Sequence, residues 1–238
     1  MVLLAALAAV VAVCAQPGQH LSTEGAGSDG SAPPSAAATL SAPRPIAPPE
    51  SKEIAPGRPV QLAVPALGMD APVEKGDCRV VDGAIDPARL REACAYTAPD
   101  RPYSLPGSDA PDVVVIAGHA AAGVPAVFDS LYDARANRHT VSLGDVLYVR
   151  TEVSSSDWLA YRATDVHEPQ KDALSASAQI WGTGATPGRL LTISCIQPAN
   201  PLADSVKNAV VGWQFDQVVS EQQVAANMGW DVPPDKGS

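Results

Sequence analysis

Arg-Leu-Leu-Thr-Ile-Ser-Cys-Ile-Gln-Pro, residues 189–198, is an apolar and β-branched run that follows Pro187-Gly188 and stops at Pro198. Such a run is typical of a buried strand, and it carries Cys195 close to its end. A thiol at the rim of a rigid strand is well placed for chemistry. The alternative is that Cys195 is one more small core residue, since free cysteine is among the most buried residue types.

A second short apolar strand is predicted upstream, at residues 112–118, and His119 follows it directly. Two strands would then each present one half of a thiol/imidazole pair. A close pair of this kind favours thiolate with imidazolium, because the ordinary pKa values are about 8.5 for cysteine and about 6.5 for histidine. This predicts attack by Cys195 on a carbonyl with His119 as general acid and base, and it calls for no metal or organic cofactor.

The two segments resemble sortases. Ile-Ala-Gly-His at 116–119, followed by Gly-Val-Pro-Ala-Val-Phe-Asp-Ser-Leu at 123–131, is similar to the histidine segment of the class F sortases of actinobacteria. Leu-Thr-Ile-Ser-Cys at 191–195 resembles the strand that ends in Thr-Cys in sortases generally. The resemblance covers roughly residues 59–213 and includes residues 66–73. It implies an all-β fold, a sortase-like closed β-barrel of about eight strands with short helices.

The pattern of the remaining chain agrees with an all-β domain. Alternating runs at 60–65, 144–150 and 159–167 have the spacing of a barrel or a sandwich. Short helices are expected at residues 87–93, 173–179 and 218–228.

Lys207 is the candidate for a third catalytic group. Counted from Cys195 without gaps, it falls where class F sortases carry the arginine of their His/Cys/Arg site, so the resemblance implies an oxyanion-side or substrate-binding cation there. Lysine keeps the charge but lacks the planar fork that donates two parallel hydrogen bonds. The alternatives are that Lys207 is a solvated loop charge, or that Arg189, at the opposite end of the strand, supplies the cation.

Three further positions depart from the family pattern. Ala121 stands where the family often has aspartate, Ser194 replaces the common threonine before the cysteine, and residues 196–200 replace the usual Gly-Gly-x-Phe-Asp. A loop changed in this way is expected to change the substrate contacts.

The resemblance implies a cysteine transpeptidase. It would cleave the Thr-Gly bond of an LPXTG-like sorting signal on a peptide or protein, pass through a thioacyl enzyme, and transfer the acyl group to an amine of the cell wall or of a protein, or to water. The rival is a catalytically degenerate protein of the same fold that binds a peptide or cell-wall components. An unrelated cysteine hydrolase of the cell wall fits less well, because its cysteine would begin a helix whereas Cys195 ends a strand.

Charge and the N-terminal sequence bear on location and partners. Sixteen Lys and Arg against 26 Asp and Glu give a net charge of −10, which argues against nucleic acid as the main partner. Residues 1–15 hold an apolar run shorter than the roughly 20 residues that span a bilayer, so they are expected to be a signal peptide or a short membrane anchor. Lipidation at Cys14 is an alternative. The rest is expected to be exported to the cell envelope or beyond it.

The chain divides by composition. Residues 16–57 are rich in Ala, Ser and Pro and are expected to form a disordered tether, residues 58–215 the catalytic domain, and residues 216–238 a C-terminal extension. In an exported protein, Cys78 and Cys94 are expected to form a disulfide that contributes about 3 kcal/mol. The alternative, a redox or metal pair, lacks the CxxC spacing that such sites use.

Overall fold

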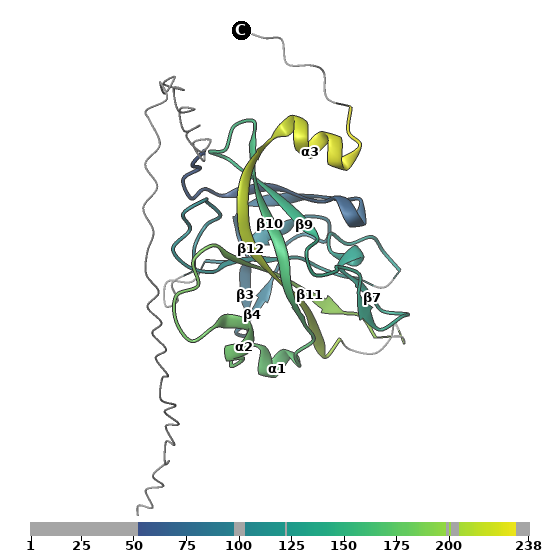
Figure 1. The fold of residues 1–238 in the computed structure, drawn as a ribbon. Coiled ribbons are helices and arrows are strands. Elements are labelled where there is room, and N and C mark those ends of the chain that lie inside the picture. Colours follow the sequence, from purple (N-terminus) through teal and green to yellow (C-terminus); the bar gives the residue numbers. More distant parts are fainter. Residues whose placement is uncertain (1–51, 98–102, 122, 199, 201–204, 232–238) are drawn as a thin grey trace, which may run out of the picture. The chain divides into compact units, whose positions relative to one another are not determined.

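The computed structural model describes residues 52–97, 103–121, 123–198, 200 and 205–231. Within these residues, eight strands close into a barrel in the order β1, β2, β5, β6, β11, β12, β10, β9 (Figure 1). The all-β closed barrel expected from the sequence is therefore confirmed. The expected signal peptide, Cys14 and residues 16–51 of the tether lie outside the described residues.

The barrel strands are β1 (Pro59–Val64), β2 (Met69–Asp77), β5 (Ala93–Ala95), β6 (Val114–Ala117), β9 (Val146–Thr151), β10 (Asp157–His167), β11 (Arg189–Ile196) and β12 (Lys207–Ser220). Two small hairpins lie outside it, β3 (Arg79–Val81) with β4 (Ala84–Asp86), and β7 (Tyr132–Asp133) with β8 (Arg138–His139). The helices are η1 (Pro65–Leu67), η2 (Asp129–Leu131), α1 (Lys171–Leu174), α2 (Ala178–Trp181) and α3 (Glu221–Met228).

β11 is buried on both faces, which explains its nearly continuous apolar sequence. Successive side chains of a strand point to opposite faces. Leu190 packs into the barrel interior with Trp213, whereas Leu191 and Ile193 pack on the outside with Val210 of β12. Thr192 is tolerated inside because it accepts a hydrogen bond from the Trp213 indole at 3.0 Å. The same alternation places Cys195 on the outer face.

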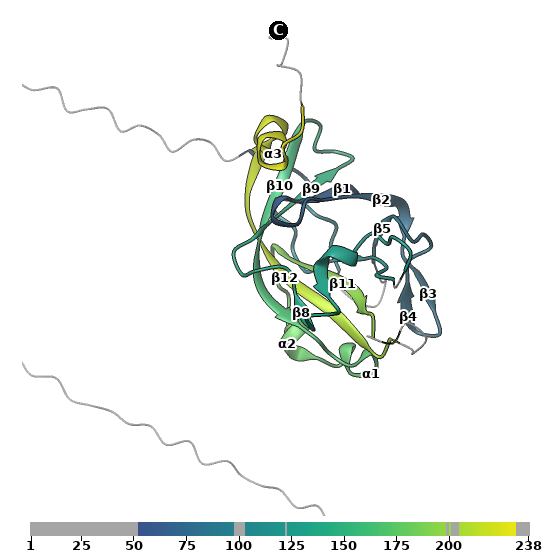
Figure 2. The same cartoon turned by 90° about the vertical axis from the view of Figure 1, so that its right-hand side faces the viewer.

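The helices lie toward the two ends of the barrel, α3 at one and α1 with α2 at the other (Figures 1 and 2). β12 continues to Ser220, so the domain boundary expected after residue 215 falls within this strand. The Ser220 hydroxyl then caps α3 by accepting from the Gln223 backbone N–H at 3.3 Å. Val224 of α3 packs with Val219 and Trp158 on the outside of the barrel.

Two other expectations differ in detail from the structure. No helix forms at residues 87–93, which run as turn and irregular backbone into β5. Residues 52–57, expected in the tether, are held by the domain: Ile54 is 5% exposed, and its backbone N–H donates to the Ser108 hydroxyl at 2.9 Å.

Candidate active site

Two neighbouring strands deliver His119 and Cys195 to the same end of the barrel. β6 and β11 run parallel, and Ala117 pairs with Ile193 at the end of the ladder. The Gly118 N–H extends it by donating to the Ile193 carbonyl at 3.0 Å. His119 and Cys195 each lie two residues beyond this last pair: Cys195 is still within β11 and on its outer face, whereas His119 is in the loop that follows β6. Both side chains are half-buried.

The loop after β6 is folded tightly against the barrel. A Cβ at Gly118 would lie 2.6 Å from the side chains of Val127 and Phe128, so a larger residue would displace the loop. The His119 carbonyl accepts from the Phe128 N–H at 2.9 Å. The Asp129 carboxylate then accepts from the backbone N–H groups of Ala121 and Ala126, at 2.8 and 2.7 Å. Asp129 thus ties the histidine loop closed from within.

The imidazole of His119 is held by the segment that the disulfide closes. Its Nε2 lies 2.8 Å from the Pro87 carbonyl oxygen. A carbonyl can only accept, so Nε2 carries the proton and Nδ1 is the nitrogen left for proton exchange. Pro87 lies between Cys78 and Cys94, which form the expected disulfide, and Cys94 packs on Ala117 of β6. The disulfide therefore holds in place the segment whose Pro87 carbonyl orients the histidine ring.

Cys195 is the only free cysteine among the described residues, and the loop that follows it contacts the histidine loop. The side-chain amide of Gln197 donates to the Ala120 carbonyl oxygen. This bond ties the segment after Cys195 to the segment after His119. Gln197 belongs to the part of the sequence that departs from the family pattern, and nothing in the sequence alone indicated this contact.

Lys207 lies on the other face of the sheet from Cys195. The register pairs Lys207 with Ile196, and directly paired residues of an antiparallel ladder point to the same face. Ile196 packs with Tyr132 and Ala209, away from the outer face. The Lys207 ammonium lies 3.9 Å from the Glu168 carboxylate. The structure thus brings His119 and Cys195 to one end of the barrel and places Lys207 on the opposite face of the sheet from Cys195.

Asn208, which the sequence analysis did not single out, is the residue that pairs with Cys195. It is half-buried, and its side-chain amide donates to the Ser194 carbonyl oxygen at 3.0 Å. Only the strand register reveals this placement, and the register depends on the length and path of the loop between β11 and β12.

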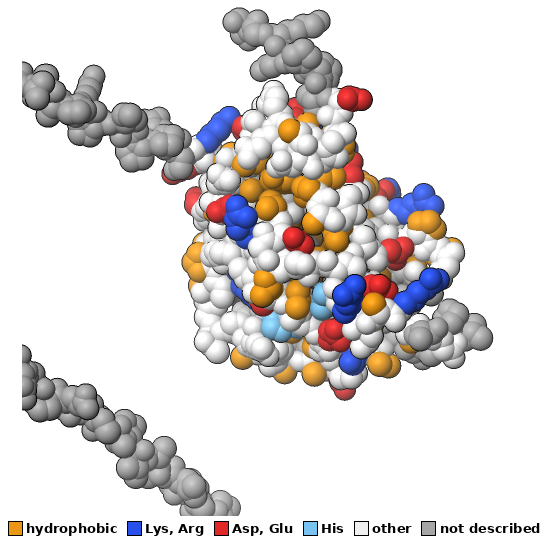
Figure 3. Space-filling view, turned by 45° about the vertical axis from the view of Figure 1, so that its right-hand side comes forward, with side chains coloured by type: hydrophobic (Ala, Val, Ile, Leu, Met, Phe, Trp, Pro, Cys, Tyr) orange, Lys and Arg blue, Asp and Glu red, His pale blue; other side chains and the backbone are white. Residues whose placement is uncertain are grey.

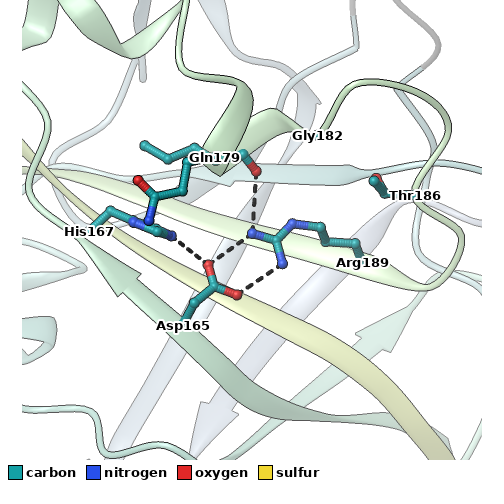
Figure 4. A pocket seen from close by; sticks show the side chains of 7 residues that line it. Asp165, His167, Gln179, Gly182, Thr186 and Arg189 are labelled. Carbon is teal, nitrogen blue, oxygen red and sulfur yellow. Dashed lines mark hydrogen bonds and ion pairs between the residues drawn. The ribbon is translucent and has the colours of Figure 1, made fainter. Parts of the chain in front are cut away.

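The start of β11 carries a cavity of about 350 Å³ with an ionic network at its base (Figure 4). Arg189 donates two hydrogen bonds to Asp165, both 2.9 Å long, and a third to the Ile180 carbonyl at 3.2 Å. His167 Nε2 lies 2.7 Å from the same carboxylate. These polar groups bond to one another, so the network acts as a clamp between the barrel and α2, and Arg189 is unavailable at the cysteine end.

Asp165 reaches Arg189 across β12 because Gly212 lies between them. A Cβ at Gly212 would lie 2.4 Å from the Asp165 carboxylate. Burial acts to raise the pKa of Asp165, but the hydrogen bonds from Arg189, Thr164 and His167 outweigh it and lower that pKa to about 2. The carboxylate therefore stays ionised within the clamp.

The outer face between the two ends of β11 is apolar and covered. Leu191, Ile193 and Val210 pack beneath Ile180 of α2, which is 2% exposed. Trp181 of α2 meets Tyr103 from the segment before β6, with ring centroids 5.5 Å apart. Side chains from α2 and from the segment before β6 thus cover the outer face of the sheet between Arg189 and Cys195.

The parts of the chain that the structure describes contain no cluster of metal-ligating side chains. No group of three or more His, Cys, Asp or Glu there is placed to hold a metal ion. Basic and acidic side chains are interspersed over the face seen in Figure 3, where histidine surface is also visible. Among the described helices, none has the length and apolar character needed to cross a membrane.

No family model and no curated protein sequence matches the chain. Solved structures that are similar to the chain include sortases of several classes. Sortase A of Listeria monocytogenes is 14% identical with a TM-score of 0.48, over 74% of this chain and 99% of that one. The SrtA sortase of Actinomyces oris is 18% identical with a TM-score of 0.45, over 80% and 94%. Sortase E1 of Streptomyces coelicolor, solved with a tripeptide in its active site, is 15% identical with a TM-score of 0.43, over 71% and 93%.

Proposed function

We propose that this chain is a cysteine transpeptidase of the sortase type, with Cys195 as nucleophile and His119 as general acid and base. One observation supports this above all: the parallel strands β6 and β11 end side by side, so that His119 and Cys195 lie at the same end of the barrel. Thiol and imidazole at the rim of one sheet form the pair that acyl transfer to cysteine requires.

The proposed reaction begins with the Cys195 thiolate attacking the carbonyl carbon of a peptide bond. A C–S bond forms, and the carbonyl π pair moves to oxygen. When the tetrahedral intermediate collapses, the C–N bond breaks and the leaving amine takes a proton from His119. The Pro87 carbonyl can accept from Nε2–H in both the neutral and the charged imidazole, so the ring keeps its orientation while Nδ1 loses and regains its proton.

The acyl group then remains on Cys195 as a thioester until an amine attacks. His119 accepts the proton of the incoming amine, and the Cys195 thiolate leaves. Water can take the place of the amine, which gives hydrolysis instead of transfer.

The finer assignments rest on the sequence resemblance. The motifs around His119 and Cys195 support a class F enzyme, a substrate with an LPXTG-like sorting signal, and an amine acceptor from the cell wall or a protein. The apolar segment within residues 1–15 and the composition of residues 16–57 support export and a tether at the cell envelope. A Cys78–Cys94 disulfide is compatible with that oxidising location.

A second candidate is a protein of this fold that binds peptide without turnover. The position of Lys207 favours it, since the cation expected on the oxyanion side lies by Glu168 on the opposite face from Cys195. Losing one oxyanion donor lowers turnover about 100- to 1,000-fold. A loss of this size would leave a protein that binds peptide but turns it over very slowly.

The two candidates differ in one assay. The full chain is incubated with a Leu-Pro-Ala-Thr-Gly peptide and a triglycine amine, and ligated peptide is measured by mass spectrometry beside Cys195→Ala. Ligation or hydrolysis at the Thr-Gly bond that needs Cys195 supports the transpeptidase. Saturable peptide binding with neither product would favour the binding protein.

A further inference from the structure

The position that faces Cys195 across the β-ladder holds a neutral amide. Asn208 is the direct partner of Cys195, and Val210, two residues along β12, packs on the outer face with Leu191 and Ile193. Since directly paired residues share a face, Asn208 and Cys195 both lie at the rim of this outer face. Asn208 is the β12 residue directly opposite the nucleophile.

The Asn208 amide is oriented by the backbone of β11. Its Nδ2 donates one hydrogen to the carbonyl oxygen of Ser194, the residue before the nucleophile, at 3.0 Å. A carboxamide nitrogen carries two hydrogens, so the second remains as a donor. The first bond restricts the rotation of the side chain and so narrows the directions open to the second N–H. A donor held in this way needs little reorganisation when negative charge develops beside it.

The cations of the same two strands are engaged elsewhere. β11 and β12 contain one arginine and one lysine, Arg189 and Lys207. Arg189 lies at the far end of β11 and is bonded to Asp165. Lys207 pairs with Ile196 on the other face and lies near Glu168. Neither therefore shares with Cys195 both its end of the strand and its outer face.

We propose that Asn208 is a catalytic residue that donates its second Nδ2–H to the oxyanion formed when Cys195 adds to the substrate carbonyl. This inference rests on the proposed function and names the donor that the reaction needs. As the C–S bond forms, the π pair moves to oxygen, and the hydrogen bond from Asn208 strengthens with the growing charge. The amide neither gains nor loses a proton.

The test compares two reactions of Cys195 in the full chain. Acylation by a Leu-Pro-Ala-Thr-Gly peptide passes through an oxyanion, whereas alkylation by iodoacetamide displaces iodide and forms none. We expect Asn208→Ala to slow acylation about 100- to 1,000-fold while its alkylation rate, across pH, stays within about twofold of wild type. Asn208→Asp, which keeps the shape but removes the donor, is expected to slow acylation at least as much.

Gln214→Ala is the matched control. Gln214 is also an amide of β12, pairs with Arg189 at the other end of β11, and donates to the Pro187 carbonyl at 3.1 Å. Its loss is expected to leave acylation within about twofold.

Three results would overturn the role of Asn208. Acylation of Asn208→Ala at the wild-type rate would exclude it as a donor. An equal fall in acylation and alkylation would show a structural role. A large loss in Lys207→Ala without a loss in Asn208→Ala would assign the oxyanion to the lysine. If wild type itself is never acylated although iodoacetamide reaches Cys195, the proposed function fails together with this inference.

Discussion

The two ends of β11 carry opposite kinds of polar site on one outer face. At the start of the strand, Arg189 is bonded to Asp165 and to the Ile180 carbonyl, and the two formal charges offset each other. At the other end, Cys195 is half-buried and unpaired, and Asn208 uses one of its two N–H groups on the backbone. The difference indicates that one end holds the structure together, while the other carries the groups to which the proposed reaction is assigned.

The largest effect is expected when a histidine is replaced at each end of β11 in turn. His119→Ala is expected to slow acylation of Cys195 by about 100- to 10,000-fold, because proton transfer to the leaving amine loses its donor. His167→Ala, at the Arg189 end, is the control and should leave acylation within about twofold. Rates are measured by intact-mass spectrometry with the sorting-signal peptide. Similar losses in both variants would contradict the division between the ends.

The next effect concerns the segment between Cys78 and Cys94, whose Pro87 carbonyl binds the His119 ring. Replacing Cys78 and Cys94 together by serine is expected to lower the free energy of unfolding by about 3 kcal/mol, since the disulfide restricts the unfolded chain. Acylation is expected to fall as well, because Pro87 lies in the segment that the disulfide closes. Urea denaturation measures the first effect. Cys195→Ser, which keeps the disulfide, should retain wild-type stability; equal stability of all three proteins would refute the support assigned to the disulfide.

A smaller loss of stability is expected at the clamp. Arg189→Gln leaves Asp165 without its main partner in a partly buried site and should cost about 2 kcal/mol of unfolding free energy. The matched control is Arg162→Gln, which breaks the more exposed pair with Asp216 and should cost at most about 1 kcal/mol. Denaturant unfolding distinguishes them, and an equal cost would show that the clamp acts as an ordinary surface pair.

The smallest effect appears on acidification. The pKa of Asp165 is lowered to about 2, so its contribution to stability is complete above the ordinary carboxyl pKa of about 4 and is lost as the pH falls toward 2. This loss is expected to be about 2 kcal/mol at most, because the carboxylate must be protonated within reach of Arg189 and His167. Asp165→Asn should show a shallower decline over the same range, measured by thermal unfolding. If the stability of wild type and of Asp165→Asn fell in parallel with pH, the clamp would be excluded as the cause of the acid-induced loss of stability.

Strand ends were the part of the site that local sequence could predict. Cys195 and His119 each lie at the end of an apolar run, and the parallel pairing of β6 and β11 brings these two ends to the same end of the barrel. The Cys78–Cys94 disulfide was also predictable, since cysteine count and export context suffice. These features depend on residues close together in the chain or on general chemistry.

Register and long-range contacts were not predictable in the same way. Counting from Cys195 suggested Lys207, but a shift of one residue along a strand changes its face, and the ladder pairs Asn208, not Lys207, with Cys195. The helix expected at residues 87–93 is replaced by irregular backbone whose Pro87 carbonyl binds His119. The pairing of Arg189 with Asp165 depends on β10 and β11 lying on either side of β12, where Gly212 leaves room for the contact. No local sequence pattern reveals this arrangement.

The most direct measurement asks whether Cys195 becomes acylated. The full chain is mixed with the Leu-Pro-Ala-Thr-Gly peptide without an amine, quenched in acid, and weighed by intact-mass spectrometry. We predict a mass increase equal to the acyl half of the peptide, mapped to Cys195, released by hydroxylamine and absent from Cys195→Ala. A wild-type mass that stays unchanged, while iodoacetamide modifies Cys195 readily, would contradict catalysis by the His119 and Cys195 pair.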